Sequence, residues 1–203
     1  MIGKRFFLYE ITEILGKGGM GVVYKAIHPM LQKVAAVKVI SQNLEGNETI
    51  IKRFEREARS MAALAHENIV RVENFGIEHN RHAILMEFIE GKNLEQLLNE
   101  REEPFDPLTS SRMIMQVCRA LQFAHSRQPP VIHRDIKPSN ILVKSDGTIK
   151  VSDFGLAKIL GVSGNTSAGF AGPDYTINEL ETRQETLTRM GSSPGTLRYM
   201  SPE

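Results

Sequence analysis

Two short stretches in the middle of the chain carry side chains suited to the chemistry of phosphate groups. One is His-Arg-Asp-Ile-Lys-Pro-Ser-Asn, which contains Asp135, Lys137 and Asn140, and the other is Asp-Phe-Gly, which begins at Asp153. Carboxylate and amide oxygens are the hard ligands that Mg²⁺ prefers. In an extended loop Lys137 lies on the same side as Asp135, where its ammonium can neutralise a phosphoryl group in transfer. A lone loop aspartate is more often a turn former, but the joint order and spacing favour a catalytic and metal-binding site.

A glycine-rich stretch, Gly16-Lys-Gly-Gly-Met-Gly21, has the pattern G-x-G-x-x-G. A dinucleotide site would need these glycines to open a helix, with an acidic residue about 20 positions further on. Here a strand pattern follows the glycines, and the residue at that distance is Lys38. We therefore expect a flexible lid between two strands, whose backbone N–H groups lie over phosphates. A merely structural hairpin turn is the alternative.

Two charged residues are predicted to lie among apolar ones. Lys38 stands in the strand Ala-Val-Lys-Val-Ile, and Glu57 lies within the apolar stripe of a helix predicted over 48–64. The stripe consists of Ile50, Phe54, Ala58, Met61 and Leu64. Each charge is costly without a partner, so the two are expected to pair if the helix packs on the sheet. The anchored ammonium can then hold nucleotide phosphates, whereas the alternative is a lysine that reaches solvent from a strand edge.

Together these motifs resemble those of the eukaryotic-type (Hanks-type) protein kinases, in a style similar to the bacterial serine/threonine kinases. The resemblance covers essentially the whole chain. It implies an enzyme that transfers the γ-phosphoryl group of MgATP to serine or threonine hydroxyls of proteins, with ATP and Mg²⁺ as cofactors. Within it, Asp135 matches the catalytic base, while Asn140 and Asp153 match the metal ligands.

The resemblance also implies the other site residues. Lys38 and Glu57 resemble the nucleotide-binding lysine and its helix partner, and Lys137 resembles the lysine of the serine/threonine kinases. Met86 resembles the gatekeeper that precedes the hinge. The full set expected to bind the nucleotide is Leu15, Gly16, Lys17, Gly18, Gly19, Met20, Gly21, Val22, Val23, Ala36, Lys38, Met86, Glu87, Phe88 and Ile89. His133 is expected to be structural and to pack against the Asp-Phe-Gly turn.

The elements that must position these residues divide the chain in two. The fold expected is α+β and protein-kinase-like, with an N-lobe over 1–90 and a partial, incomplete helical C-lobe over 91–203. The N-lobe is predicted as a five-stranded antiparallel sheet plus one helix. Its strands are expected at Phe6–Leu15, Gly21–Ile27, Val34–Ile40, Ile69–Phe75 and His82–Phe88.

Beyond residue 90 the pattern becomes helical. Asn93 is the predicted N-cap of a short helix, with Gln96 in the capping-box position. A longer helix is expected between Pro107 and Ser126, followed by a hairpin whose strands flank Ser-Asp-Gly. The core stripe of that longer helix is predicted to comprise Met113, Ile114, Val117, Leu121 and Ala124, with Cys118 as a small core residue.

The composition sets limits on the other function classes. The 203 residues carry 25 Lys+Arg against 24 Asp+Glu, a formal charge of +1, so a dedicated nucleic-acid or polybasic membrane partner is not expected. A single cysteine excludes an internal disulfide and a multi-cysteine zinc site. No apolar run approaches the roughly 18 residues of a membrane span. We expect a soluble, cytoplasmic chain.

The last quarter of the chain is predicted to regulate activity. Arg134 places a guanidinium beside the catalytic aspartate, an arrangement that a phosphate on the activation segment can neutralise. Thr186, Thr188, Ser192 and Ser193 are the candidate acceptors, Thr188 being favoured, with self-association for autophosphorylation.

The family's kinase domains continue through further helices after the Ser-Pro-Glu at which this sequence stops. Two alternatives to a kinase are therefore kept: a nucleotide-binding regulatory module with little turnover, and a small-molecule phosphotransferase. The complete motif set disfavours the second.

Overall fold

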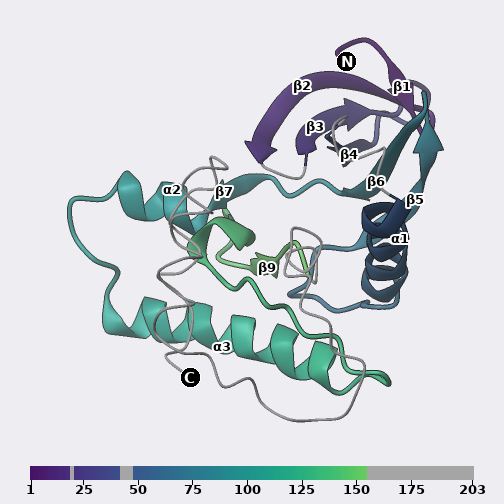
Figure 1. Ribbon diagram of the computed structural model, residues 1–203. Helices are drawn as coiled ribbons and strands as arrows, with labels where there is room; N and C mark the ends of the chain where they lie inside the picture. The colour runs from purple at the N-terminus through teal and green to yellow at the C-terminus, as the bar shows by residue number, and fades with distance from the viewer. Residues whose placement is uncertain (19–20, 42–47, 155–203) are drawn as a thin grey trace, which may run out of the picture. The chain divides into compact units, whose positions relative to one another are not determined.

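The computed structural model describes residues 1–18, 21–41 and 48–154, and all of these belong to one compact unit (Figure 1). In the first helix the side chains at positions 48–50, 53, 56, 57 and 60 also lie outside the described part. Several predicted residues therefore lie outside the described part of the chain: Gly19, Met20, the Glu57 side chain, Thr186, Thr188, Ser192 and Ser193.

The first half of the chain forms an antiparallel sheet of six strands within the described ranges, in the order β1-β2-β3-β4-β6-β5. The strands are β1 (Arg5–Phe6), β2 (Tyr9–Gly18), β3 (Gly21–Ile27), β4 (Val34–Ile40), β5 (Val72–Glu78) and β6 (Arg81–Glu87). The β3 and β4 strands have the predicted bounds, because the glycines before β3 and the turn around Pro29 separate two runs rich in β-branched residues.

Three predicted strands have different bounds in the structure, and the one expected at His82–Phe88 differs least, since β6 is shifted by one residue to Arg81–Glu87. Phe7 and Leu8 have positive φ angles of 49° and 71°, so the chain turns there and the first predicted strand divides into β1 and β2. This turn makes six strands rather than five. The strand expected from Ile69 begins instead at Val72, because Ile69 forms a parallel bridge with Val151 in a second sheet.

Helix α1 (Glu48–Ala62) packs against the sheet beside β5, as Figure 1 shows. Among the described side chains of the predicted stripe, Phe54, Ala58, Met61 and Leu64 are all buried. The ring of Phe54 lies 5.5 Å from that of Phe75 on β5. The periodic apolar stripe is thus confirmed as the face that attaches the helix to the sheet.

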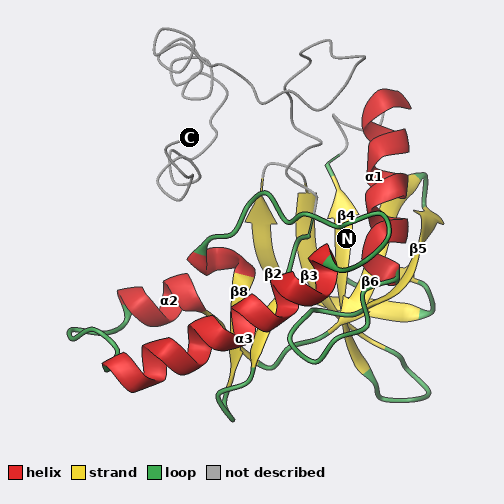
Figure 2. Ribbon diagram, turned by 90° about the horizontal axis from the view of Figure 1, so that it is seen from below, coloured by secondary structure: helices red, strands yellow, loops and turns green. Residues whose placement is uncertain are grey.

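The described part of the second half, which ends at residue 154, carries three short strands and two helices, seen from below in Figure 2. The strands β7 (Gly91–Asn93), β8 (Ile141–Lys144) and β9 (Ile149–Val151) form an antiparallel sheet, and β8 and β9 are the predicted hairpin. The helices are α2 (Leu94–Asn99) and α3 (Pro107–His125), and a 3₁₀ turn, η2 (Pro138–Asn140), leads into β8. The capping box at Asn93 and Gln96 is present as predicted.

Helix α3 turns most of the predicted stripe inward, since Met113 and Leu121 also pack against the core, and only Ile114 of the stripe faces away. Val117, Ala120 and Ala124 are its buried residues, and the helix contacts β9 through this side. Ile114 is 55% exposed, and Cys118 is exposed as well, so neither is the core residue predicted. Each follows an inward residue by one position, or about 100° around the helix, which turns its side chain away from β9. None of the helices among the described residues is long and apolar enough to cross a membrane.

Two apolar clusters hold these elements together. The larger joins α1, one face of the six-stranded sheet, α3 and the β8–β9 hairpin, and it includes the fully buried Phe154. The smaller lies on the other face of the sheet around Phe6, Tyr9 and Tyr24. Full burial of one large apolar side chain, such as that of Phe154, stabilises the fold by roughly 1.5–3 kcal/mol. Both the sheet and the hairpin that leads to Asp153 are therefore supported by a packed core.

Candidate active site

The loop before η2 is shaped by a buried histidine. His133 is 1% exposed, and its ring lies 4.6 Å from that of Phe154. Its Nδ1 accepts a hydrogen bond from the Asp135 N–H at 3.2 Å, so Nε2 carries the proton and donates to the Ser152 carbonyl at 2.8 Å. Both ring nitrogens are used to hold the backbone, which supports the predicted structural role and leaves no nitrogen to act as a base.

Asp135 is positioned by the two residues that sequence analysis grouped with it. Its Oδ2 accepts from the Lys137 ammonium at 2.9 Å and from the Asn140 amide at 3.1 Å. The same amide donates to the Asp135 carbonyl at 2.8 Å, which fixes the side chain to its own backbone. The other carboxylate oxygen, Oδ1, is buried and has no hydrogen-bond partner among the described atoms. A buried acceptor left in this way is suited to receive a donor from outside the protein.

Lys38 on β4 reaches a carboxylate that sequence analysis did not assign to it. Its Nζ lies 2.6 Å from Oδ1 of Asp153, with side chains 11% and 32% exposed. The predicted partner, Glu57, belongs to α1, and its side chain lies outside the described residues, so that pairing stays a prediction. The sequence held one signal for the observed pair. Asp153 follows the apolar residues Ile149 and Val151, which are buried in the structure and so draw Asp153 toward the core on which β4 also packs.

The two metal-ligand candidates are tied together by the residue between the hairpin and Asp153. Ser152 donates to the Asn140 carbonyl from its backbone N–H at 2.9 Å and from its hydroxyl at 3.2 Å. The NH₂ group of Asn140 is held by Asp135, which leaves the amide oxygen for a cation. Asp153 turns into the site with φ at +59° and has one carboxylate oxygen on Lys38.

This donor set fits Mg²⁺. The described residues contain no cluster of three or more His, Cys, Asp or Glu side chains. Mg²⁺ bound beside a nucleotide normally uses only one or two carboxylates, with phosphates and water completing its shell. The amide oxygen of Asn140 and the carboxylate of Asp153 are both hard oxygen donors of the kind that Mg²⁺ prefers.

The residues expected around the adenine base come from four adjacent strands of the six-stranded sheet, β2, β3, β4 and β6, and from the segment after β6. Ala36 on β4 pairs in register with Met86 on β6, and both are buried in the larger cluster, against which Val23 and Ile89 also pack. Leu15 on β2 is 42% exposed. Glu87 ends β6 and begins the predicted hinge, which Phe88 and Ile89 continue. Val22 differs, because its side chain packs on the opposite face of the sheet and leaves only its backbone for a ligand; Lys17 lies exposed on β2.

The glycines of the predicted lid have different structural demands. A Cβ at Gly16 or Gly18 would meet no atom within 4 Å, whereas one at Gly21 would lie 2.1 Å from the Val39 carbonyl oxygen. Gly21 is therefore required by the pairing of β3 with β4, while the other two leave open space.

We predict that Gly21→Ala lowers the free energy of unfolding by about 1–3 kcal/mol, because the added methyl group must push two strands apart. Gly16→Ala and Gly18→Ala are expected to stay within about 1 kcal/mol of wild type and to raise the KM for ATP. Chemical denaturation and ATP titration separate the two effects. Wild-type stability in Gly21→Ala would contradict the strand register, and an unchanged KM in the other two would contradict the lid.

His133 should also make stability depend on pH. Desolvation lowers the pKa of its imidazole, and the hydrogen bond to Ser152 opposes this only in part. The unfolded chain, with a histidine pKa of about 6.5, therefore binds the proton more readily than the fold does. This contribution is complete above pH 6.5 and is lost as the pH falls below it.

We expect the free energy of unfolding to fall between pH 7.5 and 5.5, with a shallower slope in His133→Gln than in wild type. Denaturation at several pH values measures both slopes. His125→Gln, at an exposed position, is the control and should keep the wild-type slope. Equal slopes in wild type and His133→Gln would show that His133 titrates alike in both states.

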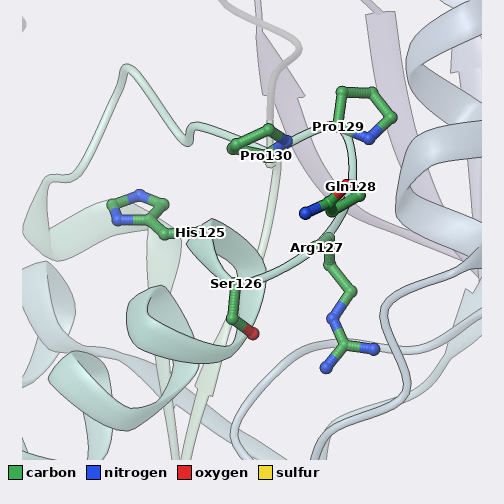
Figure 3. A pocket seen from close by; sticks show the side chains of 6 residues that line it. All are labelled: His125, Ser126, Arg127, Gln128, Pro129 and Pro130. Atoms are coloured by element: carbon green, nitrogen blue, oxygen red, sulfur yellow. The ribbon is translucent and has the colours of Figure 1, made fainter.

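A surface depression lies away from this site, at the C-terminal end of α3 (Figure 3). It is lined by His125, Ser126, Arg127, Gln128, Pro129 and Pro130. None of these residues belongs to the predicted nucleotide or metal site.

Comparisons with known proteins agree with this geometry. The model of the family described as "Protein kinase domain" matches residues 9–203. The chain is 36% identical to the probable serine/threonine-protein kinase PknB of Lactococcus lactis and 34% identical to the serine/threonine-protein kinase PrkC of Bacillus subtilis, in both cases over its whole length. It spans only 28% of the length of each of these relatives.

A solved structure gives the same result. The PknI kinase domain of Mycobacterium tuberculosis superimposes with a TM-score of 0.67 at 30% identity, over 78% of this chain and 62% of that one. The fold class expected from the motifs is thereby confirmed. The match over residues 9–203 includes every motif from which the site was built, and the chain belongs to the protein kinase domain family.

Proposed function

We propose that this chain is the catalytic part of a serine/threonine protein kinase, which transfers the γ-phosphoryl group of MgATP to a serine or threonine hydroxyl of a protein. One observation carries the proposal. Asp135 has one oxygen held by Lys137 and Asn140, while its other oxygen is buried without a partner among the described residues. This oxygen can accept a hydrogen bond from a substrate hydroxyl.

The residues suggest the following division of labour. Asp135 orients the hydroxyl and accepts its proton as the oxygen attacks the γ-phosphorus and the bond to the β-phosphate oxygen breaks. Lys137 lies 2.9 Å from the same carboxylate, where its charge can offset that of the phosphoryl group in transfer. Lys38 brings an ammonium to Asp153 and is placed to hold phosphates. Asn140 and Asp153 would hold Mg²⁺, which neutralises phosphate charge when bound.

The proposal includes where the chain works and how it is switched on. The substrate ATP supports a cytoplasmic location. The exposed Arg134, next to Asp135, supports activation by a phosphate on Thr188, added by a second copy of the chain. Mass spectrometry of active protein that finds no phosphate on Thr186, Thr188, Ser192 or Ser193 would count against this switch.

Two measurements on one sample test the proposed function. The first is thermal stabilisation of the chain by MgATP, and the second is ³²P transfer from labelled ATP to a generic acceptor protein. We expect both. Stabilisation without transfer would favour a nucleotide-binding module with little turnover. The absence of both stabilisation and transfer would contradict the nucleotide site itself.

A further inference from the structure

An ion pair outside the predicted catalytic and metal set links the hinge to the strand before Asp153. Lys150 on β9 places its Nζ 2.7 Å from Oε1 of Glu87, which is 63 residues away in the sequence. The side chains are 15% and 22% exposed, so water screens this pair less than the surface pairs of the chain. The two neighbours of Lys150, Ile149 and Val151, are fully buried. The alternation of the strand therefore turns Lys150 away from the core and toward the hinge.

The Glu87 carboxylate is held from a second side. Its Oε1 also accepts from the backbone N–H of Arg71 at 2.7 Å, and the Glu87 N–H donates to the Arg71 carbonyl at 3.0 Å. Lys150 contacts the same segment, because its ammonium lies 3.3 Å from the Ile69 carbonyl. Glu87 on β6 and Lys150 on β9 thus both contact residues 69–71, and together they hold this segment between the two strands.

Backbone hydrogen bonds extend this attachment to the start of the metal site. Val70 donates to the Val151 carbonyl at 2.9 Å, and Val151 donates to the Asn68 carbonyl at 2.8 Å. Asn68 is buried, and its side-chain amide donates to the Ile149 carbonyl at 3.0 Å. Strand β9 is therefore fixed along its length to the segment that Glu87 and Lys150 enclose, and Asp153 follows this strand directly.

We propose that Lys150 is a positioning residue, whose ion pair with Glu87 sets the distance between the adenine end and the phosphate end of the nucleotide site. The inference rests on the proposed function, because it assumes that residues 87–89 meet the base and that Asp153 meets the metal-bound phosphates. Lys150 itself touches neither. Without the pair, the hinge and Asp153 are free to shift against each other, and the nucleotide must order them when it binds.

The expected signature is a change in binding rather than in chemistry. Lys150→Met should raise the KM for ATP about tenfold, which is the range of coupling found for contacting charged groups in one network. The value of kcat at saturating ATP should stay within about twofold, since Asp135, Lys137 and Lys38 keep their contacts. Lys150→Arg retains a cation able to reach Glu87 and should recover most of the wild-type KM.

A double-mutant cycle in the full chain tests the pair. Glu87→Gln keeps an acceptor for the Arg71 N–H and removes only the charge, so Glu87→Gln and Lys150→Met should each raise the KM, and the double variant should raise it no further than the more affected single variant. Lys144→Met is the matched control, because Lys144 stands on the same hairpin in an exposed pair with Asp146. It should leave the KM unchanged.

Three results would overturn the inference: an unchanged KM in Lys150→Met, additive effects in the double variant, or a Lys150→Arg variant as impaired as Lys150→Met. Failure of the proposed function gives a different pattern. If the wild-type chain binds MgATP but transfers no phosphate, the cycle is read from the dissociation constant of MgATP, with the same expected and contrary results. A wild-type chain that binds no MgATP would overturn both proposals.

Discussion

Asp135→Asn is expected to slow phosphoryl transfer by about 10²–10⁴-fold, the range that a positioned general base contributes, and to leave MgATP binding near that of wild type. The amide has the shape of the carboxylate but cannot accept the substrate proton at neutral pH. Its nitrogen also cannot accept from Lys137 or Asn140, which both donate to Asp135 Oδ2. Single-turnover transfer at saturating MgATP measures the rate, and nucleotide titration measures the binding.

The matched control for this variant is Asp146→Asn. Asp146 caps the turn of the β8–β9 hairpin by accepting from the Thr148 N–H at 2.9 Å, and that contact lowers its pKa to about 2. It lies outside the catalytic loop, so its variant should transfer phosphate at the wild-type rate. Substantial turnover in Asp135→Asn would remove Asp135 from the role of base.

Lys38→Met is expected to slow phosphoryl transfer by about 10²–10³-fold and to lower the free energy of unfolding. The activity falls because an ammonium placed to hold phosphates is lost, which is the effect expected of one electrostatic contact in a transition state. The stability falls by about 1–3 kcal/mol because Asp153 is left without its cation, a figure kept low by the 32% exposure of the Asp153 side chain. Denaturation and the transfer assay measure the two losses separately.

A second variant distinguishes the two causes. Lys38→Met combined with Asp153→Asn removes the unpaired charge and should recover part of the stability without recovering activity. Lys33→Met is the control for an exposed lysine, since Lys33 pairs with Glu73 at 2.7 Å on the surface, and it should change stability by less than about 1 kcal/mol. Full activity in Lys38→Met would contradict the assigned phosphate contact.

The sequence predicted those elements whose signals are local. The bounds of β3 and β4, the apolar stripe of α1 and the capping box at Asn93 all depend on residues within a few positions of one another. The catalytic loop was predicted for the same reason, because Asp135, Lys137 and Asn140 lie within six residues and meet in the structure as expected.

What the sequence did not predict depends on contacts between distant segments. Ile69 does not belong to the predicted strand, because it forms a β-bridge with Val151, more than 80 residues later in the sequence. The partner of Lys38 in the described structure is Asp153, 115 residues away, and the pair of Lys150 with Glu87 spans 63. On α3 the other members of the predicted stripe face the core, whereas Ile114 and Cys118, each one position beyond an inward residue, are exposed.

Phosphoamino-acid analysis of an acceptor protein after incubation with the chain, labelled ATP and Mg²⁺ tests the central claim most directly. The arrangement of Asp135, Lys137 and Asn140 beside the Lys38–Asp153 pair predicts label on serine or threonine, lost without Mg²⁺ and reduced at least about 10²-fold in Asp135→Asn. Label that does not exceed that of Asp135→Asn, in a chain that MgATP stabilises, would contradict it.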